Sequence, residues 1–143
     1  MKDVEKIKTK IGIIQENLEE LKKLKEFKFE ELSKNKRDLA ACKYFIRSAI
    51  EAMIDIGSHI VAKELLGTPS TNVEIMLTLS NKGVLTEENL STYVKMVKYR
   101  NRLTHFYQEV IPQEVFDILQ NKLQDFELYI KDILNYFKQS NSI

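Results

Sequence analysis

Residues 38–69 read DLAACKYFIRSAIEAMIDIGSHIVAKELLGTP, and this segment sets the architecture of the whole chain. Its apolar residues recur every three or four positions, which is the spacing of one face of an α-helix. Gly67 and Pro69 supply the stop signal expected where a helix ends. The segment therefore predicts a long helix from about Asp38 to about Leu66, whose buried row consists of Leu39, Cys42, Ile46, Ala49, Met53, Ile56 and Ile60.

A polar stripe runs along the opposite side of this helix. Glu51, Asp55 and His59 follow one another at steps of four residues, so they share one face. Charged groups prefer water, and one interpretation is a solvated surface. The other is a subunit interface or a layer that supports a nearby site, because the same face holds little lysine and carries small residues that allow close approach, namely Ala41, Ser48, Ala52, Ser58 and Ala62.

The segment before residue 38 predicts a first helix that packs lengthwise on a partner. Its apolar positions alternate between spacings of three and four, and they are Val4, Ile7, Ile11, Ile14, Leu18 and Leu21. The period breaks over residues 24–32, and residues 33–36 form a polar connector. We therefore expect the first two long helices to form a hairpin.

The segments after residue 66 predict three more helices. A short one carries Val73, Met76, Leu77 and Leu79 and closes at Asn81-Lys82-Gly83. Thr86 is the expected N-cap of a fourth helix that runs to about Tyr107. Pro112 precedes a last helix whose apolar face is Leu119, Leu123, Phe126, Ile130, Ile133 and Phe137, and residues 138–143 should fray. The predicted fold is all-α, an antiparallel bundle of four long helices and one short helix in a single domain, residues 1–143.

Composition excludes several classes of protein. Apolar residues make up 43% and charged residues 30% of the 143, with four Gly and two Pro, which is typical of a soluble helical domain. The single cysteine, Cys42, fits a core position and a reducing cytosol. Residues 1–6 are charged rather than leader-like, and no apolar run approaches the ~20 residues of a membrane span. We expect a cytoplasmic protein with no membrane partner.

A basic segment begins after Glu88. No acidic residue occurs between Glu88 and Glu109, although the net charge of the whole chain is only +1. Lys95, Lys98 and Arg102 lie in this segment and are candidate contacts for RNA phosphates. Two of the four arginines, Arg100 and Arg102, lie near one of the two histidines, His105.

The residue types around Arg100 are those used to transfer phosphoryl groups. Arginine matches phosphate with a planar fork of donors, and histidine takes and gives a proton near neutrality. On a helix Asn101 and His105 are neighbours, whereas Arg100 and His105 lie about 140° apart around the axis. Convergence on one phosphate then requires a distorted helix end, a long reach by arginine, or a second copy of the chain. Arginine and histidine at a helix end also serve simply to satisfy terminal carbonyls, and this interpretation stays open.

Arg100, four residues, His105, one residue and Tyr107 together resemble the R-x4-H-x-Y motif of HEPN-domain proteins of the HepT type, with a polar Asn101 after the arginine. The resemblance extends over most of the chain in helix order and motif position. It implies a metal-independent ribonuclease toxin that works as a homodimer and is paired with a nucleotidyltransferase antitoxin, MntA. It also implies that Arg100 stabilises phosphate charge, Asn101 orients the site, His105 is the general acid/base, and Tyr107 accepts AMP from the antitoxin.

The chemistry of RNA agrees with this set of residues. RNA carries its own nucleophile, the 2′-OH, so a base, an acid and a cation suffice for cleavage. His59 and His105 have no cysteine partners for a zinc site, and no metal or other cofactor is expected. Two other functions remain open: a non-catalytic helical module that holds nucleotide or substrate for a nucleotidyltransferase, and a purely structural bundle that dimerises.

Overall fold

The computed structural model describes residues 2–139, with side chains from residue 4 onward. All regular structure in this range is helical. The elements in chain order are α1 (Lys2–Leu24), α2 (Phe29–Lys34), α3 (Lys36–Lys63), α4 (Asn72–Asn81), the 3-10 turn η1 (Glu87–Asn89), α5 (Leu90–His105), the 3-10 turn η2 (Tyr107–Glu109), α6 (Pro112–Asn121) and α7 (Gln124–Gln139). The predicted all-α class is confirmed.

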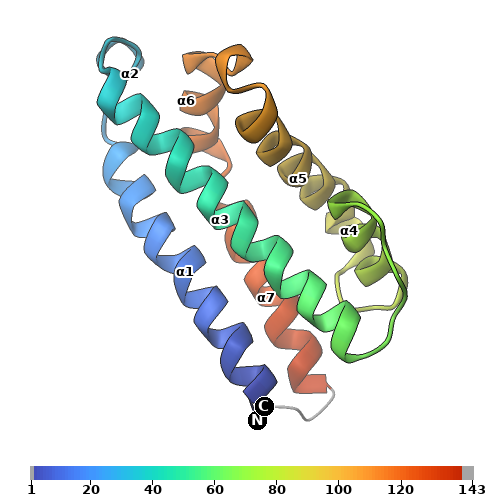
Figure 1. Ribbon diagram of the computed structural model, residues 1–143. Helices are drawn as coiled ribbons and strands as arrows, with labels where there is room; N and C mark the ends of the chain where they lie inside the picture. The colour runs from blue at the N-terminus through green and yellow to red at the C-terminus, as the bar shows by residue number, and fades with distance from the viewer. Residues whose placement is uncertain (1, 140–143) are drawn as a thin grey trace.

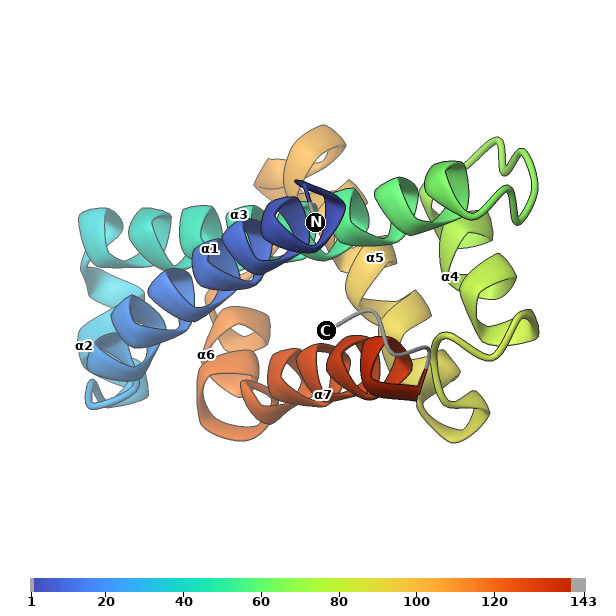
Figure 2. The ribbon, with the colours of Figure 1, turned by 90° about the horizontal axis from the view of Figure 1, so that it is seen from below.

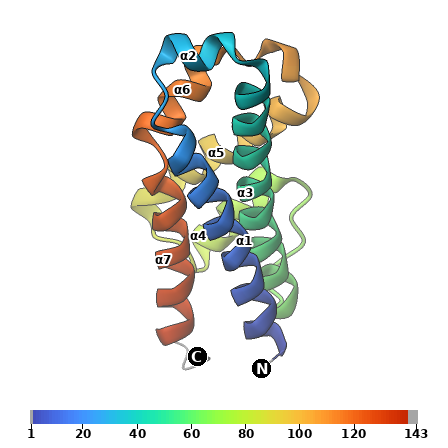
Figure 3. The same cartoon turned by 90° about the vertical axis from the view of Figure 1, so that its left-hand side faces the viewer.

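The two longest helices, α1 and α3, lie side by side and antiparallel, and α5 lies along the other side of α3 (Figure 1). Seen from below, α1 and α3 form one layer and α6 and α7 form the other (Figure 2). Short α2 joins α1 to α3 at the end of the bundle where α6 also lies (Figure 3). α3 therefore occupies the centre of the molecule, as its apolar pattern predicts.

The predicted core row of α3 is buried from Cys42 to Ile60, and only Leu39 remains partly exposed. The polar stripe carries ion pairs within the chain. Arg47 donates to Glu51 at 2.9 Å, and the exposed Asp55 accepts from Lys10 of α1 at 3.0 Å. Ala52, one of the small residues on this face, is buried by the chain itself. These contacts leave both the solvated and the interface interpretations of the stripe open.

α2 was not predicted, because residues 24–32 lack a helical period. It forms through tertiary packing: Leu32 is fully buried, and the Phe29 ring packs edge-on against Phe116 of α6 with centroids 5.5 Å apart. The predicted polar connector of residues 33–36 is reduced to Asn35, because α2 extends to Lys34 and α3 begins at Lys36. The side-chain oxygen of Asn35 accepts from the Asp38 backbone N–H at 3.0 Å and caps α3. Contacts with a distant helix, rather than local spacing, create this element.

The single last helix predicted after Pro112 is wrong, because the structure divides it into α6 and α7. The helical spacing of apolar residues continues across the break between α6 and α7, so the spacing does not reveal the break. Leu119, Leu123 and Phe126, which lie before, within and after the break, are all buried. No Gly or Pro marks the turn. The prediction that residues 138–143 fray is wrong for residues 138 and 139, because α7 continues to Gln139. Residues 140–143 lie outside the described residues.

The start of α5 is fixed by a buried carboxylate on α7. Thr86 precedes the 3-10 turn η1 and does not cap it with its side chain, contrary to the prediction. The backbone N–H and hydroxyl of Thr86 instead donate to Asp132 Oδ2 at 3.1 and 2.9 Å, and the Tyr93 hydroxyl donates to the same oxygen at 2.7 Å. Asp132 therefore ties the beginning of α5 to α7.

Gly57 permits the close approach of α4 to α3. A Cβ atom at Gly57 would lie 2.9 Å from side-chain carbons of both Ile75 and Leu79.

In the part of the chain that the structure describes, no helix is both long and apolar enough to cross a membrane.

Candidate active site

The site lies where α5 ends. The helix stops at His105, and the Phe106 backbone N–H closes its last turn by donating to the Arg102 carbonyl at 2.8 Å. Tyr107 then opens η2, so the prediction that the helix extends to Tyr107 is wrong by two residues. Arg100 and Tyr107 consequently do not share one straight helix line, because α5 ends between them.

Arg100 is held by the residue that follows it. Its Nη1 donates to Asn101 Oδ1 at 3.2 Å, and the Thr104 hydroxyl donates to the Arg100 carbonyl at 3.0 Å. Arg100 is half-buried, and its Nε is buried without a hydrogen-bond partner among the described residues. The partner amide of Asn101 is neutral, so the guanidinium is oriented while its charge stays available for an anion.

His105 and Asn101 occupy the outward side of the helix end. His105 is exposed and Asn101 is half-buried. No hydrogen bond within the described residues joins His105 to Arg100, which agrees with their angular separation on the helix. Phe106 and Ile111 are 56% and 53% exposed, so the histidine lies beside apolar surface.

Arg102 is occupied by a carboxylate. Both of its terminal nitrogens donate to Glu114 of α6, one of them to Oε1 at 3.1 Å, and Nη2 also reaches the Glu109 carbonyl at 3.3 Å. The hydrogen bonds from Arg102 hold the pKa of Glu114 below its usual range, and the same pair raises the pKa of Arg102. The ion pair therefore competes with any phosphate for Arg102, and it fastens α5 to α6.

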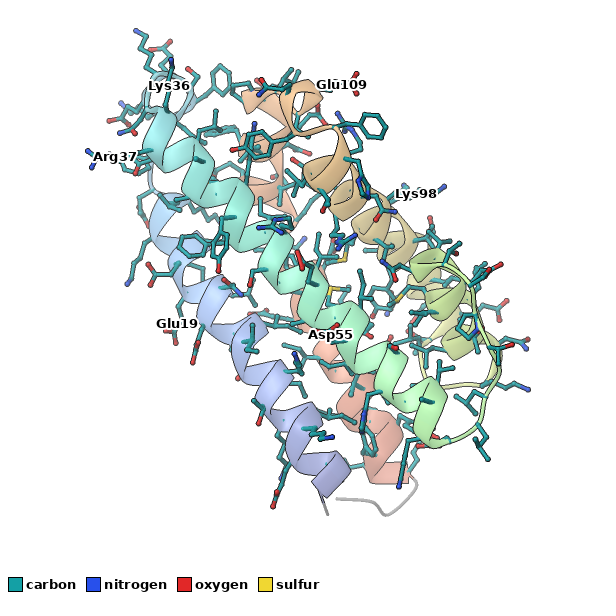
Figure 4. The ribbon with its side chains drawn as sticks, viewed as in Figure 1. Glu19, Lys36, Arg37, Asp55, Lys98 and Glu109 are labelled. Atoms are coloured by element: carbon teal, nitrogen blue, oxygen red, sulfur yellow. The ribbon has the colours of Figure 1, made fainter. Side chains whose placement is uncertain are left out.

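Lys95 and Lys98, the other predicted phosphate contacts, are both exposed. Lys98 projects from α5 away from the body of the molecule (Figure 4). It precedes Asn101 by three residues and His105 by seven, so these three share one side of α5. Lys95 instead lines a cavity of about 330 Å³ with Tyr99, Lys122 and Asp125.

Sequence analysis missed the residue that contacts Tyr107. Lys43 of α3 places its Nζ 4.2 Å from the centroid of the Tyr107 ring, and this lysine is only 7% exposed. Burial lowers the pKa of Lys43, while the nearby Glu114 carboxylate opposes that shift. The available signal was a lysine between Cys42 and Tyr44, inside an otherwise apolar part of α3.

A small pocket separates α3 from the end of α5. Lys43, Tyr44 and Arg47 line it from α3, and Thr104 and Tyr107 line it from the other side. Its volume is about 280 Å³. We call this feature the α3–α5 groove. No group of three or more His, Cys, Asp or Glu side chains in the described residues is placed to hold a metal ion.

The family model of ribonuclease HepT-like proteins matches residues 14–133 of the chain, which includes every residue of the candidate site. The chain belongs to the HepT-like family. The resemblance to HEPN proteins of the HepT type is thus confirmed, and so is the prediction that the chain is an endoribonuclease, at the level of the family.

Two relatives and one solved structure are similar over much of this HepT-like chain. A tRNA nuclease HepT of Aphanizomenon flos-aquae is 28% identical over 91% of this chain and 88% of its own. An mRNA nuclease HepT of Shewanella oneidensis is 33% identical over 59% of this chain and 64% of its own. A tri-AMPylated Shewanella oneidensis HEPN toxin, solved with its MNT antitoxin, is 25% identical over 91% of this chain and 97% of its own, with a TM-score of 0.83.

Proposed function

We propose that this HepT-like chain is a metal-independent endoribonuclease toxin that uses Arg100, Asn101 and His105. The observation that carries the proposal is the arrangement of Arg100: Asn101 orients it, no carboxylate among the described residues pairs with it, and it lies about one turn from the exposed His105. A preorganised cation of this kind stabilises charge that develops on a phosphate during reaction. Lys95, Lys98 and, when released from Glu114, Arg102 are the proposed contacts for neighbouring phosphates.

The proposed reaction needs no atom beyond RNA and the protein side chains. The 2′-oxygen attacks the adjacent phosphorus while His105 removes its proton, and the new O2′–P bond gives a five-coordinate phosphorane, from which the P–O5′ bond breaks in a second step. The imidazolium returns the proton to the leaving 5′-oxygen. The products are a 2′,3′-cyclic phosphate and a 5′-hydroxyl, and Arg100 holds the extra negative charge between the two steps.

We propose that the active form is a homodimer. Arg100 is half-buried and His105 is exposed, and they lie on different sides of α5. A second copy that brings Arg100 toward His105 of the partner subunit completes the set without distortion of either helix. The exposed Phe106 and Ile111 offer apolar surface for such a contact at the same end of the molecule.

We also propose that the toxin is neutralised by an MntA-like nucleotidyltransferase that adds AMP to Tyr107. The HEPN toxin of Shewanella oneidensis is AMPylated in its complex with the MNT antitoxin, which supports this kind of control. Tyr107 is 42% exposed and lies in a short turn, so an enzyme can reach its hydroxyl. We expect both partners to meet in the cytoplasm.

The test compares wild type with Arg100→Ala and His105→Ala on a labelled RNA, with EDTA present and absent. Each substitution should abolish cleavage at an unchanged melting temperature, because neither side chain fills the core. Lys131→Ala, an exposed position on α7, is the matched control and should cleave normally. Loss of wild-type cleavage in EDTA, or full activity of His105→Ala, would reject the mechanism.

A further inference from the structure

The positive side chains of the α3–α5 groove differ in what they bind. Arg47 donates to Glu51 at 2.9 Å, and Arg102, just beyond the groove, is held by Glu114. Lys43 has no hydrogen bond or ion pair to a carboxylate in the described part of the chain, and its ammonium faces the Tyr107 ring. Glu114 acts on Lys43 only at a distance, because its carboxylate oxygens are bonded to Arg102, so no carboxylate of the described residues is in direct contact with Lys43.

Most of the Lys43 side chain is buried, and its ammonium lies against the Tyr107 ring in the groove. Lys43 is 7% exposed, and burial of a charge costs free energy unless an opposite charge or a set of hydrogen bonds compensates for it. An aromatic face compensates only in part. A partly desolvated cation at the edge of a pocket, with no carboxylate in direct contact, is suited to an anion that enters the pocket.

The groove has the other features of a nucleotide site. Tyr44 and Tyr107 present rings on its two sides, with Tyr44 54% and Tyr107 42% exposed. The Arg47 guanidinium lies 5.8 Å from the centroid of the Tyr44 ring, which keeps that ring against α3. Exposed rings accept stacked bases, and a cation between them meets the phosphate of the same nucleotide.

We propose that Lys43 binds a phosphodiester beside Tyr107. In the free toxin the ligand is a backbone phosphate of the RNA, next to the one that is cleaved. In the neutralised toxin it is the phosphodiester that links AMP to the Tyr107 hydroxyl, which the lysine on the ring face can reach by rotation. This inference rests on the proposed function. It explains inhibition of the nuclease as competition between the RNA phosphodiester and the AMP–Tyr107 phosphodiester for the Lys43 ammonium.

The first experiment measures RNA binding with cleavage switched off. In a His105→Ala background, Lys43→Met should weaken the binding of a single-stranded RNA about tenfold, which corresponds to loss of one charge-assisted contact. The slope of log Kd against log salt concentration should fall by about 0.7, the value for one phosphate on a single strand. Lys43→Arg should keep both the affinity and the slope.

Two controls make this result specific. Lys131→Met removes an exposed lysine of α7 and should leave affinity and slope unchanged. Melting curves should show Lys43→Met folded, because methionine keeps most of the apolar stem. Unchanged affinity and slope for Lys43→Met would overturn the inference. Absence of RNA cleavage by wild type would instead reject the proposed function, since binding is measured independently of cleavage.

The second experiment separates the two phosphodiesters. The same binding series is repeated after the nucleotidyltransferase has added AMP to Tyr107. If the tyrosyl phosphodiester already occupies Lys43, the tenfold difference between the lysine and methionine proteins should disappear. A difference of the same size in modified and unmodified protein would overturn the shared site.

Discussion

Arg102 of α5 and Glu114 of α6 are joined by two parallel hydrogen bonds, one of them 3.1 Å long, across the turn that carries Tyr107. Glu114 Oε1 also accepts from the Ile111 backbone N–H at 3.4 Å. One carboxylate therefore holds the end of the site helix and the start of the next helix together. The geometry of the motif therefore depends on an ion pair between Arg102, an intervening residue of the motif, and Glu114, which lies beyond it.

This pair should make stability depend on pH in the acid range. Arg102 lowers the pKa of Glu114, so its stabilising contribution is complete above the unfolded-state value, about 4.3, and is lost as pH falls through the folded-state pKa. Glu114→Gln should lower the melting temperature at pH 7 only slightly, because solvent screens an ion pair that is partly exposed. Thermal unfolding from pH 7 to pH 3 should show a steeper decline for wild type than for Glu114→Gln. Parallel curves would show that the pair contributes nothing.

Removal of the buried carboxylate on α7 should cost much more. Asp132→Ala leaves the Thr86 N–H and the hydroxyls of Thr86 and Tyr93 without their acceptor. We expect a loss of about 3–5 kcal/mol in the free energy of unfolding, measured by urea denaturation. Tyr93→Phe removes only one donor and should cost about 1 kcal/mol. Equal losses in the free energy of unfolding for the two variants would mean that the two hydrogen bonds from Thr86 to Asp132 do not stabilise the fold.

Asn101 should act through Arg100 rather than on RNA. Asn101→Ala removes the acceptor at 3.2 Å that orients the guanidinium, and kcat should fall roughly 10- to 100-fold with little change in KM. Asn101→Asp keeps an acceptor in place but neutralises the arginine charge, so it should not restore kcat. Steady-state cleavage assays distinguish the cases. Recovery of activity in Asn101→Asp would contradict the requirement for an uncompensated cation.

Tyr107→Phe should escape modification by the nucleotidyltransferase while the domain stays folded. Intact mass spectrometry after incubation with the enzyme and ATP should show adenylate additions on wild type alone. The other tyrosines of α5 are poor acceptors, because Tyr93 is fully buried and the Tyr99 hydroxyl is buried too. Tyr44, 54% exposed across the groove, is the position to map if additions persist in the Phe variant.

The homodimer should have sites that combine two copies. Light scattering should give twice the 16.8 kDa of one chain. A mixture of Arg100→Ala and His105→Ala proteins should regain about a quarter of wild-type cleavage, because half of the dimers are mixed and each mixed dimer has one intact composite site. A monomer at tens of micromolar, or no regain after exchange of subunits, would place both groups of a site on one chain.

The sequence allowed prediction of features that depend on local spacing. The buried row of α3 from Cys42 to Ile60 and the helical setting of Arg100 to His105 follow from positions close together in the chain. α2 forms only because Phe116 packs on Phe29, and the turn between α6 and α7 keeps the apolar period intact. Such features depend on contacts between distant segments, which periodicity does not reveal.

The same limit applies to the site. Arg100, Asn101, His105 and Tyr107 form a short motif that can be recognised in a linear sequence. Lys43 meets Tyr107 only because α3 packs against α5, and a lysine in a helix is usually solvated. Arg102 looked like a phosphate contact because Glu114 lies beyond the interruption of the helix. Its carboxylate partner became evident only in three dimensions.

Asp132 and Glu114, which anchor the two ends of α5, both follow the motif in the chain, and this order bears on when α5 is fixed during synthesis. α5 is fixed near its beginning by a side chain of α7 and near its end by a side chain of α6, and both partners leave the ribosome after the motif does. A nascent chain that has exposed Arg100 to His105 still lacks both anchors, since domains fold as units once their segments have emerged. Nascent chains stalled before and after residues 112–139 have emerged, and then assayed for RNA cleavage, would test whether these residues are needed before activity appears. We therefore expect nuclease activity only after residues 112–139 have left the ribosome.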